Sequence, residues 1–310
     1  MNEPVISASA LQFSYGEKRV LRDIELNIYP GEIFGLVGAD GAGKSTLLSL
    51  AVGQLKPESG NINILGKIAT DPVLRDDIAY MPQGFGLYPD LSVIENLEFF
   101  ADLHGLPKSQ ALQRIADLLQ RTGLKGFEKR RGGNLSGGMM QKLALACALV
   151  HQPKVMFLDE PTTGVDPLSR RAFWRLLENV TAEGVTILYA TANMDEAERC
   201  NRVAMLEQGV LLRQGTPLEL SLSDKYQLLA VMGQDIRQFR HQIRQLPGVK
   251  FSFPVGLQLN VWLLANKPLD EFQMELQGIS SQLKFEVQHP TLQDATLREL
   301  ALAQERINHG

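Results

Sequence analysis

A glycine-rich stretch that ends in a lysine and two hydroxyl residues carries the clearest chemistry in this chain. Residues 38–46 fit the pattern G-x-x-x-x-G-K-[ST]. Glycines let backbone N–H groups curl around phosphates, and a helix that begins there adds partial positive charge. In this arrangement Lys44 reaches the β- and γ-phosphates of a nucleotide, and the Ser45 hydroxyl ligates Mg²⁺. The predicted phosphate-binding residues are Gly38, Ala39, Asp40, Gly41, Ala42, Gly43, Lys44, Ser45 and Thr46.

The residues on either side of this stretch supply the context that the pattern needs. Residues 33–37 form an apolar run typical of a buried strand, and residues 46–52 carry the leucines of a following helix. A glycine-rich turn is the simpler alternative. The order of strand, glycines and helix favours a phosphate cradle over that alternative.

Two acidic residues follow a second buried run. Residues 155–158 are apolar and lead into Asp159 and Glu160. A buried parallel strand delivers its last residues to the crevice that holds the phosphates, so Asp159 can hold the Mg²⁺ shell and Glu160 can polarise an attacking water. A solvated turn would also carry two acidic residues. The phosphate cradle in the same chain favours the catalytic interpretation.

A second anion-binding arrangement lies between these two segments. Ser136, Gly137 and Gly138 open a helix that runs over residues 140–150. A serine followed by glycines at a helix start suits a phosphate. The chain therefore carries two phosphate-binding ends.

Alternating strands and helices must position these groups. Residues 186–190 and 203–206 form further short apolar runs separated by helix-like segments, which indicates a parallel sheet covered on both sides. Residues 5–37 alternate apolar and polar positions, as in a small β region, and the period becomes helical from about 90 to 150. The predicted fold class is α/β with a helical insert.

The pattern of apolar and polar residues changes near residue 216. The pattern beyond it predicts strands and helices in the order βαββαβ, which is typical of a ferredoxin-like split βαβ module. The expected strands are 227–232, 249–253, 258–264 and 283–287, and the expected helices are 235–246 and 269–277. We therefore predict a nucleotide-binding domain over 1–221, with its insert at about 85–150, and a small α+β domain over 222–310.

Composition excludes several classes of protein. The chain has 310 residues, of which 44% are hydrophobic, and 35 acidic residues against 31 basic ones give a net charge of −4. This balance argues against nucleic acid as the main partner. No stretch approaches the roughly 18 apolar residues of a membrane span and no signal peptide is evident, so we expect a soluble, cytoplasmic protein. Cys147 and Cys200 lie outside any metal-binding pattern and are expected to be buried, reduced thiols.

Residues 5–216 resemble the nucleotide-binding subunits of ATP-binding cassette (ABC) transporters. Segments of the chain match an aromatic loop, the phosphate loop, a glutamine loop, the signature segment, the acidic pair and a loop at the dimer interface, in the family's order. These segments are residues 13–16, 38–46, 81–83, 135–139, 159–160 and 163–167. The resemblance implies a P-loop NTPase of the ABC type that uses ATP and Mg²⁺.

The resemblance also implies roles for single residues. Tyr15 stacks on adenine, and Gln83 and Asp159 complete the metal shell with Ser45. Glu160 is the catalytic base, with Gln83 and Lys44 as the other catalytic residues. The signature segment, with Ser136, Gly137 and Gly138, closes over ATP that a second subunit holds.

Simpler alternatives stay open for individual residues of these motifs. Tyr15 could be a surface aromatic residue in a turn, and Gln83 could be an ordinary polar residue after a proline. Asp166 could cap the helix that begins at Pro167.

The chain departs from the family at one catalytic position. The family carries a histidine after the strand that ends near residue 191, and this chain has Ala192. A methyl group cannot contact the γ-phosphate, so hydrolysis at this chain's own site should be slower by on the order of a hundredfold. Thr191 or Asn193 could substitute in part. Met139, where the signature usually has glutamine, should matter less.

The sequences of residues 84–97 and of the end of the chain are similar to those of drug-export ATPases of the ABC-2 type. We expect an ATPase subunit on the cytoplasmic face of the membrane that forms a head-to-tail dimer and drives a separate integral membrane permease. Phe85, Leu87 and Tyr88 would suit a groove for that partner, or they belong to the core of the insert.

Two rival functions remain. A catalytically weak ATP-binding half could pair with a second, competent cassette, as in exporter ATPases with two cassettes in tandem, whose first cassette this chain resembles. A soluble ABC protein of translation or DNA repair would carry two cassettes or a long coiled-coil insert, and neither is present in this sequence.

Overall fold

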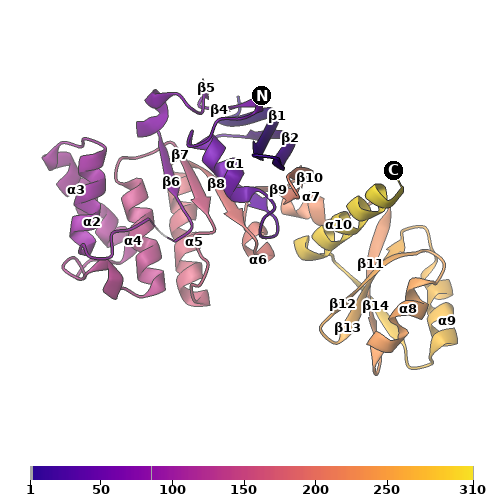
Figure 1. Ribbon diagram of the computed structural model, residues 1–310. Coiled ribbons are helices and arrows are strands. Elements are labelled where there is room, and N and C mark those ends of the chain that lie inside the picture. The colour runs from indigo at the N-terminus through magenta and orange to yellow at the C-terminus, as the bar shows by residue number, and fades with distance from the viewer. Residues whose placement is uncertain (1–2, 85, 310) are drawn as a thin grey trace. The chain divides into compact units, whose positions relative to one another are not determined.

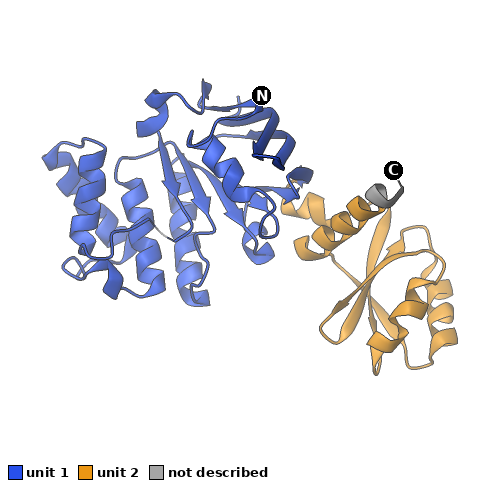
Figure 2. Cartoon of the chain, in the orientation of Figure 1, with its two compact units in different colours: residues 1–214 blue, residues 215–310 orange. Residues whose placement is uncertain are grey.

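The computed structural model describes residues 3–84 and 86–309, and the chain divides into two compact units. Unit 1 comprises residues 1–214 and unit 2 comprises residues 215–310 (Figure 2). The division precedes helix α7 (Pro217–Ser221), whereas the boundary predicted from the sequence follows that helix.

Unit 1 is built on a six-stranded sheet in the order β10-β9-β3-β8-β7-β6. Strands β9, β3, β8, β7 and β6 run parallel. Every residue of β3, β7 and β8 is buried, which explains why these segments are largely apolar in the sequence. The predicted parallel-sheet core is confirmed. The strands are β3 (Ile33–Val37), β6 (Ile78–Met81), β7 (Val155–Asp159), β8 (Thr186–Thr191), β9 (Arg202–Glu207) and β10 (Val210–Gly215).

A smaller antiparallel sheet has the order β2-β1-β4-β5. In the chain, β1 and β2 precede the first strand of the large sheet, and β4 and β5 lie between β3 and β6. Helix α1 (Lys44–Ala51) shares one hydrophobic cluster with both sheets, to which β1 contributes Ile6, α1 contributes Leu47 and β7 contributes Phe157. This shared core fixes the start of α1 relative to both sheets. The strands of the smaller sheet are β1 (Ile6–Tyr15), β2 (Lys18–Ile28), β4 (Ser59–Ile64) and β5 (Lys67–Ile68).

The helical insert packs around a core of its own. Helices α2 (Val93–Leu103), α3 (Lys108–Thr122) and α4 (Gly137–Leu149) lie side by side at one end of unit 1 (Figure 1). Ser92 begins α2 with a capping box, in which its side chain and that of Glu95 each accept a backbone N–H. The remaining helical segments of unit 1 are η1 (Pro72–Asp76), η2 (Gly132–Asn134), α5 (Pro167–Ala182) and α6 (Met194–Ala197).

Unit 2 contains a four-stranded antiparallel sheet in the order β12-β13-β11-β14. The elements follow the βαββαβ order that the sequence predicts, and a last helix is added. They are β11 (Tyr226–Met232), η3 (Ile236–Phe239), α8 (Arg240–Arg244), β12 (Val249–Val255), β13 (Gln258–Leu264), α9 (Leu269–Ile279), β14 (Lys284–Gln288) and α10 (Leu292–His309). The single helix predicted over 235–246 is wrong, because Asp235 adopts a left-handed conformation and a 3₁₀ turn precedes the short α8.

Helix α10 was not expected from the sequence, and it ties α7 to the sheet of unit 2. The guanidinium of Arg298 is 1% exposed and donates to the carbonyl oxygens of Leu220 and Ser221 at 3.0 and 3.2 Å. It also lies 4.7 Å from the ring of the buried Trp262 on β13. A buried charge needs such partners, so Arg298 joins three elements of unit 2.

The cysteines and the helices of the structure bear on two predictions made from the composition. Cys147 and Cys200 are buried and free, as predicted, and burial raises the pKa of both thiols. Among the residues that the structure describes, no helix combines the length and the apolar character required to cross a bilayer.

Candidate functional site

The carboxyl ends of four neighbouring parallel strands meet at one edge of the large sheet. Strand β3 leads into residues 38–46, β7 ends at Asp159, β8 precedes Ala192, and β6 precedes Gln83. Such an edge is where open α/β sheets bind their ligands. The strand order therefore brings together four segments that lie far apart in the sequence.

Two glycines of the phosphate loop are required by geometry. Gly43, the residue before α1, has a φ of 113°, which side chains rarely tolerate. A Cβ on Gly38 would lie 2.2 Å from the carbonyl oxygen of Leu206 on β9. The loop therefore passes close against the neighbouring strand and turns sharply into the helix.

Lys44 is the first residue of α1, and its side chain is 5% exposed. Its Nζ donates to the carbonyl oxygens of Gly38 at 2.8 Å and Ala39 at 3.1 Å. The same Nζ lies 3.1 Å from Oε1 of Glu160. An acidic side chain from the end of β7 thus reaches the lysine of the loop after β3.

One cavity of about 790 Å³ gathers most of the predicted site residues. Of the predicted residues it is lined by Tyr15, Asp40, Gly41, Gly43, Lys44, Ser45, Thr46, Gln83 and Glu160. Gly38, Ala39 and Ala42 belong to the same loop but do not line the cavity. The cavity wall therefore combines an aromatic residue, the phosphate loop and Glu160.

Asp159, the last residue of β7, is 3% exposed. Its carboxylate interacts with the hydroxyl groups of Ser45 and Tyr80. Burial raises the pKa of its carboxyl, and the nearby Glu160 raises it further, while the Ser45 hydroxyl opposes the shift. Burial and Asp159 together raise the pKa of Tyr80 to about 12.

The surroundings of Asp159 fit a divalent cation. Its Oδ1 is buried and accepts no hydrogen bond from the described residues. Oxygen ligands from a carboxylate and a hydroxyl are those that Mg²⁺ prefers, with water and phosphate oxygens as the others. No cluster of three or more acidic, histidine or cysteine side chains that could hold a metal occurs in the described ranges, so phosphate and water would have to supply the remaining ligands.

Glu160 adopts an uncommon backbone conformation. Its φ is 47°, in the left-handed region that residues with a side chain seldom occupy. Its N–H donates to the carbonyl oxygen of Ala190 on β8 at 3.0 Å, and the Thr163 hydroxyl donates to its Oε2 at 3.3 Å. The turn aims the carboxylate at Lys44 and into the cavity.

Tyr15, at the end of β1, is 53% exposed. Its ring meets that of Phe13 edge to face, with centroids 4.9 Å apart. The Tyr15 ring is therefore held partly by its contact with Phe13. An exposed aromatic ring on the wall of a cavity can stack on a planar ligand.

The signature segment, residues 135–139, lies outside this cavity. Ser136 is exposed and caps α4, where its hydroxyl accepts the Met139 N–H at 3.3 Å. A Cβ on Gly138 would lie 2.3 Å from the Ser169 hydroxyl on α5, so glycine lets these two helix starts meet. The chain does not bring its own signature segment to its own phosphate loop.

Two of the open alternatives are addressed by direct contacts. Asp166 caps α5, because its Oδ1 accepts the N–H groups of Leu168 and Ser169 and Pro167 occupies the first turn. Leu87 packs on the core of the insert, whereas Tyr88 is 46% exposed. Phe85 lies outside the described residues.

Ala192 borders a second, smaller cavity of about 270 Å³. Glu160 lines both this cavity and the larger one. The small cavity is otherwise lined by Thr162, Thr163, Arg170, Thr191, Asn193 and Glu196. Among its described lining residues there is no histidine, so the space beside Glu160 next to Ala192 holds no imidazole.

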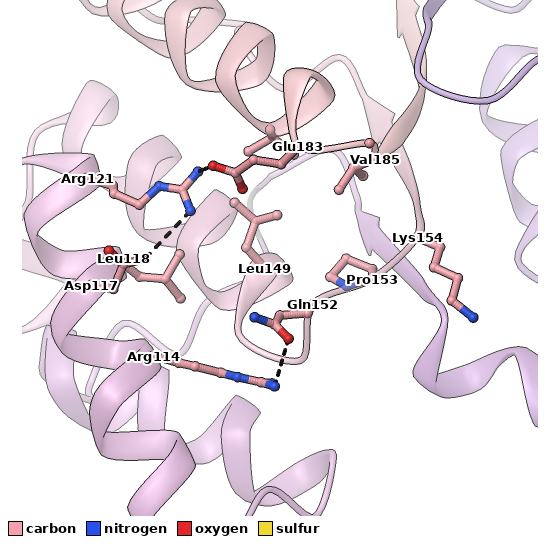
Figure 3. A pocket seen from close by; sticks show the side chains of 12 residues that line it. Arg114, Asp117, Leu118, Arg121, Leu149, Gln152, Pro153, Lys154, Glu183 and Val185 are labelled. Carbon is pink, nitrogen blue, oxygen red and sulfur yellow. Dashed lines mark hydrogen bonds and ion pairs between the residues drawn. The ribbon is translucent and has the colours of Figure 1, made fainter.

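Further hollows lie away from these strand ends. A cavity of about 380 Å³ lies beside the start of β7, where Arg121 pairs with Glu183 at 2.7 Å and Arg114 donates to Gln152 at 2.8 Å (Figure 3). A groove of about 480 Å³ is bordered by η1, α2 and the end of α4. His104 and His151 stack within that groove, with ring centroids 3.7 Å apart.

The sequence did not indicate all of the residues that line the main cavity. Lys18, Arg19 and Arg22 of β2 and Gln208 also line this cavity. The three basic residues within seven positions after Tyr15 were the available signal. Their positive charge suits a polyphosphate.

Comparisons with known proteins agree with this geometry. The profile of the family described as "ABC transporter" matches residues 21–163. The chain is 45% identical over 279 residues to the probable multidrug ABC transporter ATP-binding protein YbhF of Escherichia coli (strain K12), which covers 88% of this chain and 48% of that protein. The chain thus spans about half the length of that relative.

A second relative is matched over most of its length. The Nod factor export ATP-binding protein I of Paraburkholderia xenovorans (strain LB400) is 37% identical over 79% of this chain and 82% of that protein. Among solved structures, the dimeric ATP-binding cassette MJ0796 bound to ADP and Pi superposes with a TM-score of 0.62 at 26% identity, over 68% of this chain and 98% of that one.

Proposed function

This chain belongs to the ABC transporter family of ATP-binding proteins, and from that premise we propose that it is the ATP-hydrolysing subunit of a membrane exporter. The observation that carries the proposal is the cavity that joins Tyr15, the phosphate loop, Gln83 and Glu160. An aromatic wall, a phosphate cradle and an acidic residue are the three parts that nucleotide hydrolysis requires in one place.

The proposed roles follow from where the side chains lie. Tyr15 stacks on adenine, and the N–H groups of residues 38–46 bind the phosphates. Lys44 leaves Glu160 and contacts the β- and γ-phosphates. Ser45, Gln83 and Asp159 hold Mg²⁺, which neutralises developing charge on the phosphates when bound.

Glu160 is the proposed catalytic base. Its carboxylate orients a water for in-line attack on the γ-phosphorus and accepts a proton from it. The bond from the γ-phosphorus to the bridging oxygen breaks, and ADP and phosphate result. Because little covalent chemistry falls to the protein, most of the rate depends on how firmly Glu160 and Lys44 are positioned.

We propose that two cassettes close head to tail around ATP. The signature segment, residues 135–139, whose Ser136 is exposed, does not line its own chain's ATP cavity and is thereby free to cover the ATP of a second cassette. The dimeric ADP-bound cassette among the structural neighbours supports this arrangement. The second cassette is another copy of this chain or a different one.

An integral membrane permease is the proposed partner, which places this chain on the cytoplasmic face of the membrane. The groove beside η1 and α2 supports the proposal, because Leu103 in it is 48% exposed and the partly buried Phe100 adds apolar surface. Tyr88 and Phe99, with ring centroids 4.7 Å apart, add exposed aromatic surface. Such surfaces suit an amphipathic helix.

A Leu103→Asp variant tests the groove. Capture of the membrane partner should fall sharply, while ATP binding stays unchanged, because Leu103 lies outside the ATP cavity. Leu112→Asp is the matched control, since Leu112 on α3 is 62% exposed and does not line the groove. Equal capture by all three proteins would remove the groove from the proposal.

Ala192 favours the second candidate function, a catalytically weak ATP-binding half that pairs with a competent cassette. The small cavity beside Ala192 contains Glu160 but no imidazole among its described lining residues. ATP turnover of the isolated chain, compared with that of a Glu160→Gln variant, separates the two functions. A measurable rate that the variant loses supports the hydrolytic subunit, and MgATP binding without turnover supports the weak half.

A further inference from the structure

A buried carboxylate that takes no part in the roles above lies directly behind the turn of Glu160. Glu196 belongs to α6, the short helix after β8, and its side chain is 4% exposed. It lines the small cavity together with Glu160 and Ala192. A buried carboxylate is costly unless every oxygen has a partner, so its contacts need an explanation.

Three hydroxyl groups donate to Glu196. The Thr162 hydroxyl donates to Oε1, and the hydroxyls of Thr191 and Tyr189 donate to Oε2 at 2.8 and 3.0 Å. The Arg170 Nε lies 3.4 Å from Oε1. The carboxylate thus contacts the turn after β7, the end of β8 and the first turns of α5.

The negative charge of Glu196 affects the pKa of the neighbouring Tyr189. Burial, and then the negative charge of Glu196, raise the pKa of Tyr189 well above its usual range. The Tyr189 hydroxyl therefore keeps its proton and remains a donor to the carboxylate. No ligand has to be invoked to satisfy this group, because protein donors do so.

The contact with Thr162 bears on Glu160. The left-handed backbone of Glu160 is uncommon for a residue with a side chain, and such conformations persist only where the surroundings hold them. Before the turn, the Glu160 N–H is held by the carbonyl oxygen of Ala190 on β8. After the turn, Thr162 is held by Glu196, which is itself fixed to β8 through Tyr189 and Thr191.

The same carboxylate restrains the other wall of the small cavity. The Thr191 hydroxyl donates to Glu196 and also accepts the N–H of Asn193 at 2.9 Å. Residues 191–193, which include Ala192, are therefore fixed through the same group. One side chain holds the segments on both sides of the space next to Glu160.

We propose that Glu196 is a positioning residue for ATP hydrolysis: it holds the turn of residues 160–162 against the end of β8 and so keeps the Glu160 carboxylate aimed into the ATP cavity. This inference rests on the proposed role of Glu160 as catalytic base. Glu196 lies behind the reacting groups and does not line the ATP cavity.

A Glu196→Gln variant tests the proposal, because glutamine has the same size but one acceptor oxygen and no charge. The hydroxyl donors then compete for a single oxygen and an amide NH₂. The matched control is Glu178→Gln on α5, whose carboxylate is 52% exposed and pairs with Arg199. Wild type and both variants are compared in single-turnover hydrolysis with the protein in excess, which detects slow rates.

The expected result separates positioning from plain stability. Turnover of Glu196→Gln should fall on the order of tenfold to a hundredfold, because small misplacement of a catalytic group costs that much. The Kd for MgATP should stay within about twofold of wild type, since the phosphate loop is untouched. Glu178→Gln should keep wild-type turnover. Turnover of Glu196→Gln equal to that of the control overturns the proposal, and so does an equal loss of turnover and ATP affinity.

A second measurement is independent of hydrolysis. Amide hydrogen exchange over residues 159–163, followed by mass spectrometry, should be faster in Glu196→Gln than in Glu178→Gln, because the turn is released. If wild type neither binds nor hydrolyses MgATP, the proposed function fails, and the exchange rates still decide the role of Glu196. Unchanged exchange over these residues then overturns the positioning role.

Discussion

The ammonium group of Lys44 lies 3.1 Å from a carboxylate oxygen of Glu160, and the two side chains are only 5% and 15% exposed. Both groups are proposed to act on the same nucleotide, one on its phosphates and one on the attacking water. Without nucleotide they neutralise each other. Binding of ATP must therefore separate a partly buried ion pair.

This pair predicts that a Glu160→Gln variant binds MgATP more tightly than wild type. Removing the Glu160 carboxylate frees Lys44 and also removes the repulsion between that carboxylate and the γ-phosphate. Together these changes should strengthen binding by about 1 kcal/mol, or roughly fivefold in affinity. Equilibrium titration with a fluorescent ATP analogue measures the Kd, and Glu178→Gln serves as the unchanged control. Weaker binding by Glu160→Gln would contradict a competition between Glu160 and phosphate for Lys44.

Ala192→His should raise the rate of ATP hydrolysis. The small cavity beside Ala192 has room for an imidazole next to Glu160. A donor there would stabilise charge on the γ-phosphate, and the gain should be up to about a hundredfold. Steady-state phosphate release measures it. Ala192→Phe fills the space without a donor and should bring no gain; an equally unimproved Ala192→His would show that the missing imidazole is not limiting.

Tyr15→Ala should weaken ATP binding. Stacking of a base on an aromatic ring is worth about 1–3 kcal/mol by alanine substitution, so the Kd should rise by about tenfold or more. Tyr15→Phe keeps the ring and should bind as wild type does. Calorimetric titration with ATP and with inorganic triphosphate distinguishes loss of base stacking from damage to the phosphate site. Triphosphate has no base, so it should bind both variants equally.

The His104 and His151 stack predicts a loss of stability in acid. Burial is the main cause that lowers the pKa of His151 to about 4 from its ordinary 6.5, and the neighbouring His104 and Arg114 act in the same direction. Asp76 and the hydrogen bond with the Ile78 carbonyl oppose the shift. Burial also lowers the pKa of His104, despite the nearby Asp76.

Between pH 6.5 and about pH 4 the unfolded chain binds a proton that folded His151 rejects, so the free energy of unfolding falls as the pH falls. Allowing for solvent screening, the loss is on the order of 1–2 kcal/mol. Urea unfolding at pH 7.5 and pH 5.0 measures it. His151→Phe keeps the ring but not the titration and should show a smaller difference; identical differences would exclude His151 as the source.

Much of the fold follows from the sequence for a simple physical reason. Strands β3, β7 and β8 are buried on both faces, so their sequences are apolar throughout and easily recognised. Helix α10 was missed although it has a signal. Thr291 and Asp294 each accept the other's backbone N–H, which is the pattern of a capping box. The local sequence pattern alone did not show that a helix would pack against the sheet of unit 2.

The candidate site was predictable where motifs end parallel strands and less so elsewhere. The phosphate loop, Gln83 and Glu160 line one cavity because the strand order brings their segments to one edge. Arg22 lines the same cavity through pairing within the smaller sheet, which depends on tertiary packing. Glu196 was not identified because a buried carboxylate among hydroxyls has no distinctive spacing in sequence.

Arg298 has a practical consequence for dissecting this chain. Its guanidinium is buried between the carbonyl oxygens of Leu220 and Ser221 and the ring of Trp262. A fragment of the second unit that begins after Ser221 would keep this charge and remove two of its acceptors. A cut before Thr216 leaves α7 attached to its contacts, so fragments intended for separate expression should be divided there.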